Sequence, residues 1–291
     1  MSESTKIEWC DSTVNPVMGC DGCELWFGDV KTCYAGFLHG RFAGATPGYA
    51  PKFEQVTKFP GRMMIAAKWN DLQATERKTK PWLNGLQRLI FVSDMGDALS
   101  SSVEFPYLEE QIIRSVCSIA GQRHKWLWLT KRPDRMATFS NYLADKGIAW
   151  PENLCAGTSI TRQSTVSRIN VLQKVGNLET MRFLSVEPQL SPVVLDEELA
   201  TISWVIQGGE SGAGARPFDF KWAESLRDTC RHTNVPYFLK QVGSNPVSSG
   251  IPVKLKSYHG NNWNEWPGAL RIRETPFERE LDIFELLEAG A

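Results

Sequence analysis

WLWLTKRPD, residues 126–134, decides the fold class because it joins an expected strand to an expected helix. Residues 126–130 form a short, continuous apolar run, which is typical of a strand buried on both faces. Pro133 and Asp134 then open a segment with helical spacing that extends to about residue 146. A strand that leads directly into a helix is the repeating unit of α/β proteins with a parallel sheet.

The same unit is expected several times on both sides of this stretch. Further helices are expected near residues 61–75, 107–120, 163–175 and 219–232. The expected strands are residues 13–18, 89–93, 126–130, 154–157, 182–186, 204–207 and 237–240. About seven parallel strands predict an α/β fold that is a complete or partial TIM-type barrel. A doubly wound open sheet would use the same elements, and periodicity alone does not separate the two.

The chain is expected to have two parts. Residues 1–243 would form the barrel, and residues 244–291 would form a C-terminal extension packed on it. Pro246, Ser248, Ser249 and Gly250 mark the start of this extension, because they interrupt the alternation of strands and helices.

The composition is typical of a soluble globular protein. The chain has 291 residues, of which 42% are apolar and 22% are charged, and this excludes a disordered, collagen-like or coiled-coil protein. Lys and Arg number 32 against 33 Asp and Glu, which gives no support to a mainly electrostatic attachment to nucleic acid or to an anionic membrane. No apolar run approaches the roughly 20 residues of a spanning helix, and residues 1–8 lack the features of a secretory signal. We therefore expect a cytoplasmic protein without a membrane span.

Polar residues follow the expected strands at their carboxyl ends. They are Ser93, Asp94 and Asp97, then Lys131 and Arg132, Thr158 and Ser159, Glu187 and Pro188, residues 207–210, and finally Lys240 and Gln241. In both parallel architectures the active site lies at this edge of the sheet. Any single member of the set has the alternative role of a solvated loop residue.

Three cysteines within 14 residues carry the strongest chemical signal. Cys20, Cys23 and Cys33 are expected in a loop, residues 19–35, that follows the first strand. A structural zinc site commonly has four protein ligands, for which His39 is the nearest additional candidate. An iron-sulfur cluster is held by three cysteines when one iron is reserved for a non-protein ligand. Separately buried thiols are the remaining alternative.

The other four cysteines are not expected to bind a metal. Cys117, Cys155 and Cys230 lie within expected helices or strands and are predicted to pack in the core. Cys10 precedes the first strand and is predicted to be a non-ligand. Seven cysteines in a reducing compartment do not predict a disulfide framework.

Short motifs occur in a fixed order along residues 6–243. They are KIEW (6–9), NPV (15–17), GC (19–20), CYA (33–35), SDMGD (93–97), LTKRP (129–133), LSVEP (184–188), GGESG (208–212), ARP (215–217) and KQ (240–241). This ordered set resembles the phage-type three-cysteine family of the radical S-adenosylmethionine (SAM) superfamily. One departure is the cysteine spacing: many members of that family have a long gap followed by a close pair, whereas here the close pair comes first. Cys23, the middle cysteine, is the position that departs.

The resemblance implies a 4Fe-4S cluster held by Cys20, Cys23 and Cys33, with SAM bound at the remaining iron. One electron from a reductant such as a flavodoxin would split SAM into methionine and a 5′-deoxyadenosyl radical, which removes a hydrogen atom from the substrate. Such cofactors carry the chemistry, whereas the protein supplies binding, orientation and the exclusion of competing reactions.

Several cofactor-binding residues are expected beside the cysteine loop. From its place in the family pattern, Asp97 is expected to accept a hydrogen bond from the ammonium group of SAM. Lys131 and Arg132 are candidates for the carboxylate of SAM or for a substrate anion. A loop carboxylate and a surface pair of cations are the structural alternatives at these positions.

The later strands are expected to supply the rest of the site. Gly208 and Gly209 would let the backbone approach SAM closely, and Glu210 would accept hydrogen bonds from its ribose hydroxyls. A bare glycine-rich turn is the alternative. Glu187 and Lys240 are the candidate catalytic residues, which either bind the substrate or handle a proton.

The resemblance directs the substrate expectation to DNA. The expected substrate is a modified nucleobase, an amino-acid-thymine adduct that the enzyme rearranges (isomerises) during bacteriophage DNA hypermodification in the host cytoplasm. Trp69 and Trp82 are candidates to stack on an extruded base, and Lys78 is a candidate phosphate contact. The alternative for these residues is a solvated basic face with both tryptophans in the core.

Two other functions remain open at this point. One is a radical SAM repair lyase that acts on damaged DNA. The other is a non-catalytic, zinc-stabilised barrel that binds nucleic acid or protein. The first would require DNA lesions as substrate, and the second would give a colourless protein that contains zinc.

Overall fold

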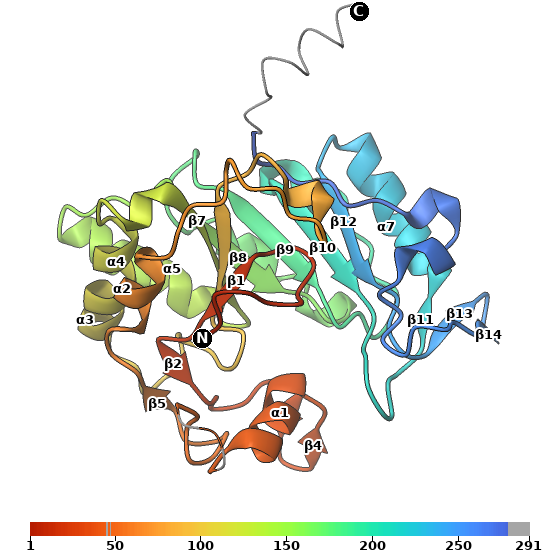
Figure 1. Cartoon of the computed structure of the whole chain (residues 1–291), viewed down its shortest axis with the longest axis horizontal. Coiled ribbons are helices and arrows are strands. Elements are labelled where there is room, and N and C mark those ends of the chain that lie inside the picture. The colour runs from red at the N-terminus through yellow and green to blue at the C-terminus, as the bar shows by residue number, and fades with distance from the viewer. Residues whose placement is uncertain (45, 47, 279–291) are drawn as a thin grey trace, which may run out of the picture.

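The computed structural model describes residues 1–44, 46 and 48–278, and its central feature is a parallel sheet of seven strands (Figure 1). The strands are β1 (Ser12–Val14), β6 (Arg88–Val92), β7 (His124–Thr130), β8 (Leu154–Ser159), β9 (Arg182–Val186), β10 (Trp204–Gly208) and β12 (Tyr237–Gln241). Their order across the sheet is the same as their order along the chain. A doubly wound sheet reverses its strand order at one point, so that alternative is wrong. The predicted α/β class with parallel strands is confirmed, in the form of a curled, partial barrel.

Most of the predicted strands occur within two residues of their predicted bounds, but the first one is divided. Residues 13–18 form β1 and a separate β2 (Val17–Met18), which pairs with β5 (Thr57–Lys58) outside the main sheet. Pro16 explains the break, because proline has no N–H group for a strand ladder. The other short strands are β3 (Trp26–Phe27), β4 (Val30–Lys31), β11 (Phe218–Asp219), β13 (Pro246–Ser248) and β14 (Ile251–Pro252).

Helices connect the strands, and several are shorter than predicted. They are α1 (Tyr34–Phe42), α2 (Arg62–Ala67), α3 (Phe105–Leu108), α4 (Arg114–Val116), α5 (Pro133–Asp145), α6 (Arg168–Leu172) and α7 (Phe220–His232), with a π-helical turn, Glu109–Ile113, between α3 and α4. The helix expected to reach residue 75 ends at Ala67, and the chain then turns where the Asp71 carboxylate accepts the Leu72 N–H. None of the helices among residues 1–44, 46 and 48–278 has the length and apolarity that crossing a bilayer requires.

The two faces of the sheet pack against different sets of side chains. Residues such as Ile90, Trp126 and Val205 belong to an outer core beneath the helices. The alternate residues form an inner core, which includes Trp9, Phe183 and Trp204. The rings of these three residues lie with their centroids 6.2–6.3 Å apart, so aromatic side chains fill the concave side of the sheet.

Terminal segments cover both edges of the sheet in place of barrel closure. At the β1 edge, the Ser2 and Thr13 backbones exchange hydrogen bonds of 2.8 and 2.9 Å. At the β12 edge, the Leu239 N–H donates to the Ile272 carbonyl at 3.0 Å. Among the described residues β1 and β12 do not pair with each other, so the barrel is open between these strands.

The described part of the predicted extension, residues 244–278, is held at the β12 edge by aromatic contacts. The Arg273 guanidinium lies 4.0 Å from the centroid of the Trp82 ring and 5.0 Å from that of Trp263. Its Nη2 also donates to the Lys240 carbonyl at 3.2 Å. Residues 279–291 of the predicted extension lie outside the described residues.

We expect Gly157→Ala to destabilise the protein by about 1–3 kcal/mol through overpacking. A β-carbon at Gly157 would overlap the ring of Phe183, which is buried in the inner core. Urea-induced unfolding measures the effect. The matched control is Gly40→Ala in α1, where a β-carbon meets no atom of the described residues within 4 Å and alanine favours the helix. Equal stabilities of the two variants would contradict the prediction.

Candidate functional site

The structure places the predicted polar residues at one edge of the sheet, where the seven strands end. Asp97 follows β6, Arg132 follows β7, Glu187 follows β9, and Lys240 is the fourth of the five residues of β12. The cysteine loop and α1 lie beyond this edge, below the strand ends in Figure 1. The chain therefore brings the cysteines and the polar strand ends to the same side of the molecule.

Cys20 is held tightly against the end of β6. Its N–H donates to the Phe53 carbonyl at 2.7 Å, and the residue is 9% exposed. The preceding Gly19 forms a parallel bridge with Gly96 and has a positive φ of 84°. A β-carbon at Gly19 would lie 2.6 Å from the Gln55 carbonyl oxygen, so only glycine fits here.

Cys23 and Cys33 lie on either side of the short β3–β4 hairpin. The Cys23 Sγ accepts the Leu25 N–H at 3.4 Å. Cys33 is the N-cap residue of α1. Cys20 and Cys33 both contact one apolar group of side chains that includes Phe53 and Met95. Within the described residues, no three side chains of His, Cys, Asp or Glu are arranged to hold a single metal ion.

Burial shapes the acidity of two of these thiols. It raises the pKa of Cys20 to about 11, although the neighbouring Arg132 opposes this rise. Burial also raises the pKa of Cys23, and the charge of Lys131 opposes it. Both thiols are therefore protonated at neutral pH in the structure, and thiolate coordination by them would release protons.

The remaining cysteines lie elsewhere. Cys10, Cys155 and Cys230 are buried, and for the last two this confirms the prediction of core packing. The same prediction is wrong for Cys117, which is exposed just after α4. The reason is that the helix turns the Cys117 side chain outward, whereas the neighbouring Ser115 and Val116 face the core.

Arg132 connects the cysteine loop to Asp97. Both terminal nitrogens of its guanidinium lie 3.8 Å from the Cys20 Sγ, and Nη2 also donates to the Gly22 carbonyl at 2.6 Å and to the Asp21 carboxylate. Nη1 donates to Asp97 Oδ2 at 2.9 Å. The sequence motifs contain Arg132 and Asp97 but do not reveal this pairing.

Asp97 is buried and has its carboxylate oxygens occupied within the protein. It accepts the Thr130 hydroxyl at 2.8–2.9 Å and the Leu99 N–H at 3.0 Å, in addition to Arg132. Lys131 is half-buried and, among the described residues, forms no ion pair. Of the two adjacent cations, Lys131 and Arg132, Lys131 is therefore the one available to an anionic ligand.

Glu187 and Lys240 form an ion pair on the concave side of the sheet. Their side chains are 15% and 17% exposed, respectively. Burial would lower the pKa of Lys240, but the Glu187 carboxylate and, more weakly, that of Glu8 raise it overall. Lys240 is therefore a cation at neutral pH. A β-carbon at Gly208 would lie 3.1 Å from Glu187 Oε1, so this glycine leaves room for the pair.

Gly209 and Glu210 organise the loop that follows β10. A β-carbon at Gly209 would lie 2.6 Å from the Val242 carbonyl oxygen. The Arg216 guanidinium donates to both carboxylate oxygens of Glu210, at 2.6 and 2.8 Å. Burial opposes ionisation of Glu210, but the contacts with Arg216 outweigh it and lower its pKa. In this structure Glu210 holds its own loop.

Two residues of this edge, Tyr34 and Asn15, had no role assigned from the sequence. The Tyr34 hydroxyl donates to the Asp94 carbonyl, which joins the start of α1 to the residues after β6. Asn15 donates to Asp94 Oδ1 at 2.5 Å and accepts the Met95 N–H at 2.9 Å. Their positions in the NPV, CYA and SDMGD motifs were the available signal.

The structure does not bring Trp69, Trp82 and Lys78 to this edge. Trp69 packs on the outer core, and the Arg88 guanidinium lies 5.8 Å from its ring centroid. Trp82 packs on the inner core, and its Nε1 donates to the Glu8 carbonyl at 2.8 Å. Lys78 is exposed and lies next to Arg77, which binds residues before the start of β6.

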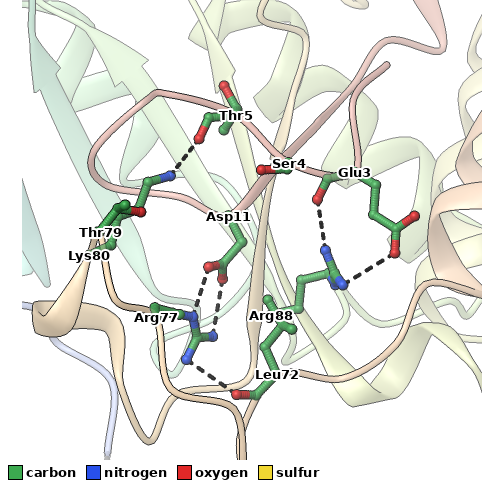
Figure 2. Close-up of a pocket in the computed structure, with 9 residues that line it drawn as sticks. All are labelled: Glu3, Ser4, Thr5, Asp11, Leu72, Arg77, Thr79, Lys80 and Arg88. Carbon is green, nitrogen blue, oxygen red and sulfur yellow. Dashed lines mark hydrogen bonds and ion pairs between the residues drawn. The ribbon is translucent and has the colours of Figure 1, made fainter.

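A cavity of about 360 Å³ opens at the opposite, amino-terminal edge of the sheet, and Figure 2 shows its lining. Its cations are engaged within the protein. Arg77 makes two bonds to the Asp11 carboxylate, at 2.8 and 3.1 Å, and Lys80 donates to the Thr5 carbonyl at 2.8 Å. Arg88 donates to the Glu3 carbonyl at 2.9 Å. These contacts fasten the segment before β1 to the segment before β6.

Comparison with known proteins identifies the family. Neither a search of curated proteins nor a search of solved structures gave a match. A family described as "Protein of unknown function (DUF5131)" matches residues 4–267. This match spans the whole seven-stranded sheet and the cysteine loop, and it ends before residues 272–274, which cover the β12 edge. The chain belongs to the DUF5131 family of proteins of unknown function.

Proposed function

We propose that this protein is a radical SAM enzyme that binds a 4Fe-4S cluster through Cys20, Cys23 and Cys33 and acts on a modified nucleobase in DNA. The observation that carries the proposal is the position of these three thiols. They lie in one loop at the carboxyl edge of a curled parallel sheet, beside polar strand ends that face the same side. In parallel α/β folds this edge is where active sites occur.

The chemistry and position of the cysteines support a thiolate-bound iron-sulfur cluster as the cofactor. Cys20 and Cys33 border the same apolar group of side chains, and Cys33 stands at the amino end of α1. Thiolates are the ligands that iron-sulfur clusters use. When bound, the cluster and SAM would supply one-electron cleavage of SAM and abstraction of a hydrogen atom.

The residues near the cysteine loop would bind and orient SAM. Lys131, which lies beside Cys23 and forms no ion pair among the described residues, would bind the carboxylate. Asp97 would accept a hydrogen bond from the ammonium group of SAM. Since the Thr130 hydroxyl already donates to Asp97, the same carboxylate would then accept from both groups. Gly208 would let the backbone approach SAM closely. Gly209 and Glu210 would hold the loop that follows it in place.

Glu187 and Lys240 would hold the substrate over the aromatic inner core. Together they offer one anionic acceptor and one cationic donor, and a polar modified base has matching groups. The rings of Trp9, Phe183 and Trp204 exclude water beneath them. Because Lys240 is held as a cation, it would donate a hydrogen bond and would not act as a base.

Anaerobic purification tests the proposal. Iron and sulfide analysis is expected to find both elements, and the reduced protein is expected to produce 5′-deoxyadenosine from SAM. A colourless protein that contains zinc would overturn the proposal and favour a zinc-stabilised binding barrel.

The same assay tests the substrate with three DNA samples. Plain DNA, DNA that carries an amino-acid-thymine adduct and DNA that carries lesions are each added to the reduced protein and SAM. We expect the adduct alone to increase 5′-deoxyadenosine formation and to be rearranged. A response to lesions alone would favour a repair lyase, and no response to any of the three would contradict a nucleobase substrate.

A further inference from the structure

We propose that Arg132 is a positioning residue that sets the reduction potential of the iron-sulfur cluster through its contact with Cys20. This inference rests on the proposed function. It assigns Arg132 to the thiolate side of the site and leaves Lys131 for the carboxylate of SAM.

The guanidinium of Arg132 is fixed from several directions. The Asp97 carboxylate holds Nη1 at 2.9 Å, the Gly22 carbonyl holds Nη2 at 2.6 Å, and the Asp21 carboxylate also binds Nη2. Only 17% of the side chain is exposed. A guanidinium with this many fixed partners does not swing toward a ligand without breaking several charge-assisted hydrogen bonds.

The anionic partners of Arg132 are themselves held in place. The Ser101 backbone N–H and hydroxyl donate to Asp21 Oδ2 at 2.7 and 2.8 Å. The Thr130 hydroxyl donates to Asp97 and also accepts the Arg132 N–H at 2.9 Å. The position of the cation beside Cys20 is therefore determined by the strand ends of β6 and β7.

This placement has a definite electrostatic consequence. Both terminal nitrogens lie 3.8 Å from the Cys20 Sγ, within reach of N–H···S hydrogen bonds. Reduction of a cluster adds negative charge that the ligand sulfurs share. A fixed cation and hydrogen bonds to a sulfur stabilise the reduced form, and so they raise the reduction potential.

A redox titration of the anaerobic protein without SAM, followed by electron paramagnetic resonance, tests the inference with two variants. Arg132→Met removes the cation and is expected to make the midpoint potential more negative. Asp97→Asn removes a neighbouring negative charge and is expected to make it more positive. Opposite shifts in variants of two bonded partners are not expected from a loss of structure alone.

Another ion pair of the cysteine loop, between Glu24 and Arg168, provides the control. Arg168 donates to both oxygens of Glu24, at 2.8 and 2.9 Å, and its guanidinium makes no sulfur contact among the described residues. The double variant Glu24→Gln, Arg168→Met removes this pair without a change in net charge. Because the two removed charges oppose each other, the double variant is expected to shift the potential less than Arg132→Met does.

The outcomes separate this inference from the proposed function. A wild-type protein without iron and sulfide overturns both. A wild-type protein with a cluster, together with an Arg132→Met variant of equal iron content and unchanged potential, overturns the role of Arg132 alone. If Arg132→Met does not retain iron, Asp97→Asn decides, and an unchanged or more negative potential in that variant overturns the inference.

Discussion

Alanine in place of Cys20 is expected to abolish iron binding and the broad visible absorption of the anaerobically purified protein. A cluster that three thiolates hold has no spare protein ligand, so the loss of one removes an essential bond. The Cys20 backbone is held by its hydrogen bond to the Phe53 carbonyl and by the Gly19–Gly96 bridge just before it. Iron and sulfide analysis of the variant measures the effect.

Cys23→Ala is the more informative companion variant, because Cys23 is where the cysteine spacing departs from the family pattern. It is expected to lose iron to the same extent as Cys20→Ala and Cys33→Ala. Cys117→Ala is the control, since this exposed thiol follows α4 on the far side of the outer core, and it is expected to keep the wild-type iron content. Full iron content in Cys23→Ala would exclude Cys23 as a ligand.

Arg77→Met is expected to destabilise the folded protein by about 3–5 kcal/mol, because it leaves the charge of Asp11 buried without its partner. The two side chains are 7% and 6% exposed. Arg77 also donates to the Leu83 and Leu86 carbonyls, at 2.5 and 2.8 Å, and the variant removes these bonds as well (the pair is shown in Figure 2). Urea-induced unfolding at neutral pH gives the free energy of unfolding.

Two further variants make this test specific. Adding Asp11→Asn to Arg77→Met removes the unpaired charge and is expected to recover part of the lost stability. Arg114→Met breaks the ion pair between Arg114 and Glu110, whose side chains are 70% and 54% exposed, and is expected to cost about 0.5 kcal/mol or less. Similar losses in Arg77→Met and Arg114→Met would show that the buried pair contributes no more than a surface pair.

The strands of the sheet could be predicted from the sequence because their signal is local. Most buried strands are short and largely apolar, and β7 and β9 begin and end within two residues of the predicted bounds. The helix expected at 61–75 ends at Ala67 in the structure. Part of residues 68–75 has helical spacing, but the Asp71 carboxylate accepts the Leu72 N–H and turns the chain there. The spacing of apolar residues does not reveal such a hydrogen bond. Residues 272–274 pair with β12 through backbone hydrogen bonds. Their sequence, IRE, is too short to show the pattern of a strand, so this pairing could not be predicted.

The sequence predicts where the candidate site lies, but it does not predict which of its side chains bond to one another. Polar residues after buried strands must gather at one sheet edge, so Asp97, Glu187 and Lys240 could be assigned to that edge. Their partners depend on how loops fold over the strand ends. Arg132 reaches Cys20 across 112 positions of sequence, and neither residue type predicts the other. The same reason explains why the sequence assigned no role to Tyr34.

The hydrogen bonds between residues 272–274 and β12 affect whether copies of this protein associate with one another. An uncovered outer strand presents a row of free N–H and C=O groups, on which a strand of another molecule can add. Here the Ile272 carbonyl and the Glu274 N–H already satisfy Leu239 and Tyr237. A recombinant fragment that ends before residue 272 would expose the backbone N–H and C=O groups of β12, so strands of other copies would pair with it. In the longer chain residues 272–274 occupy these groups.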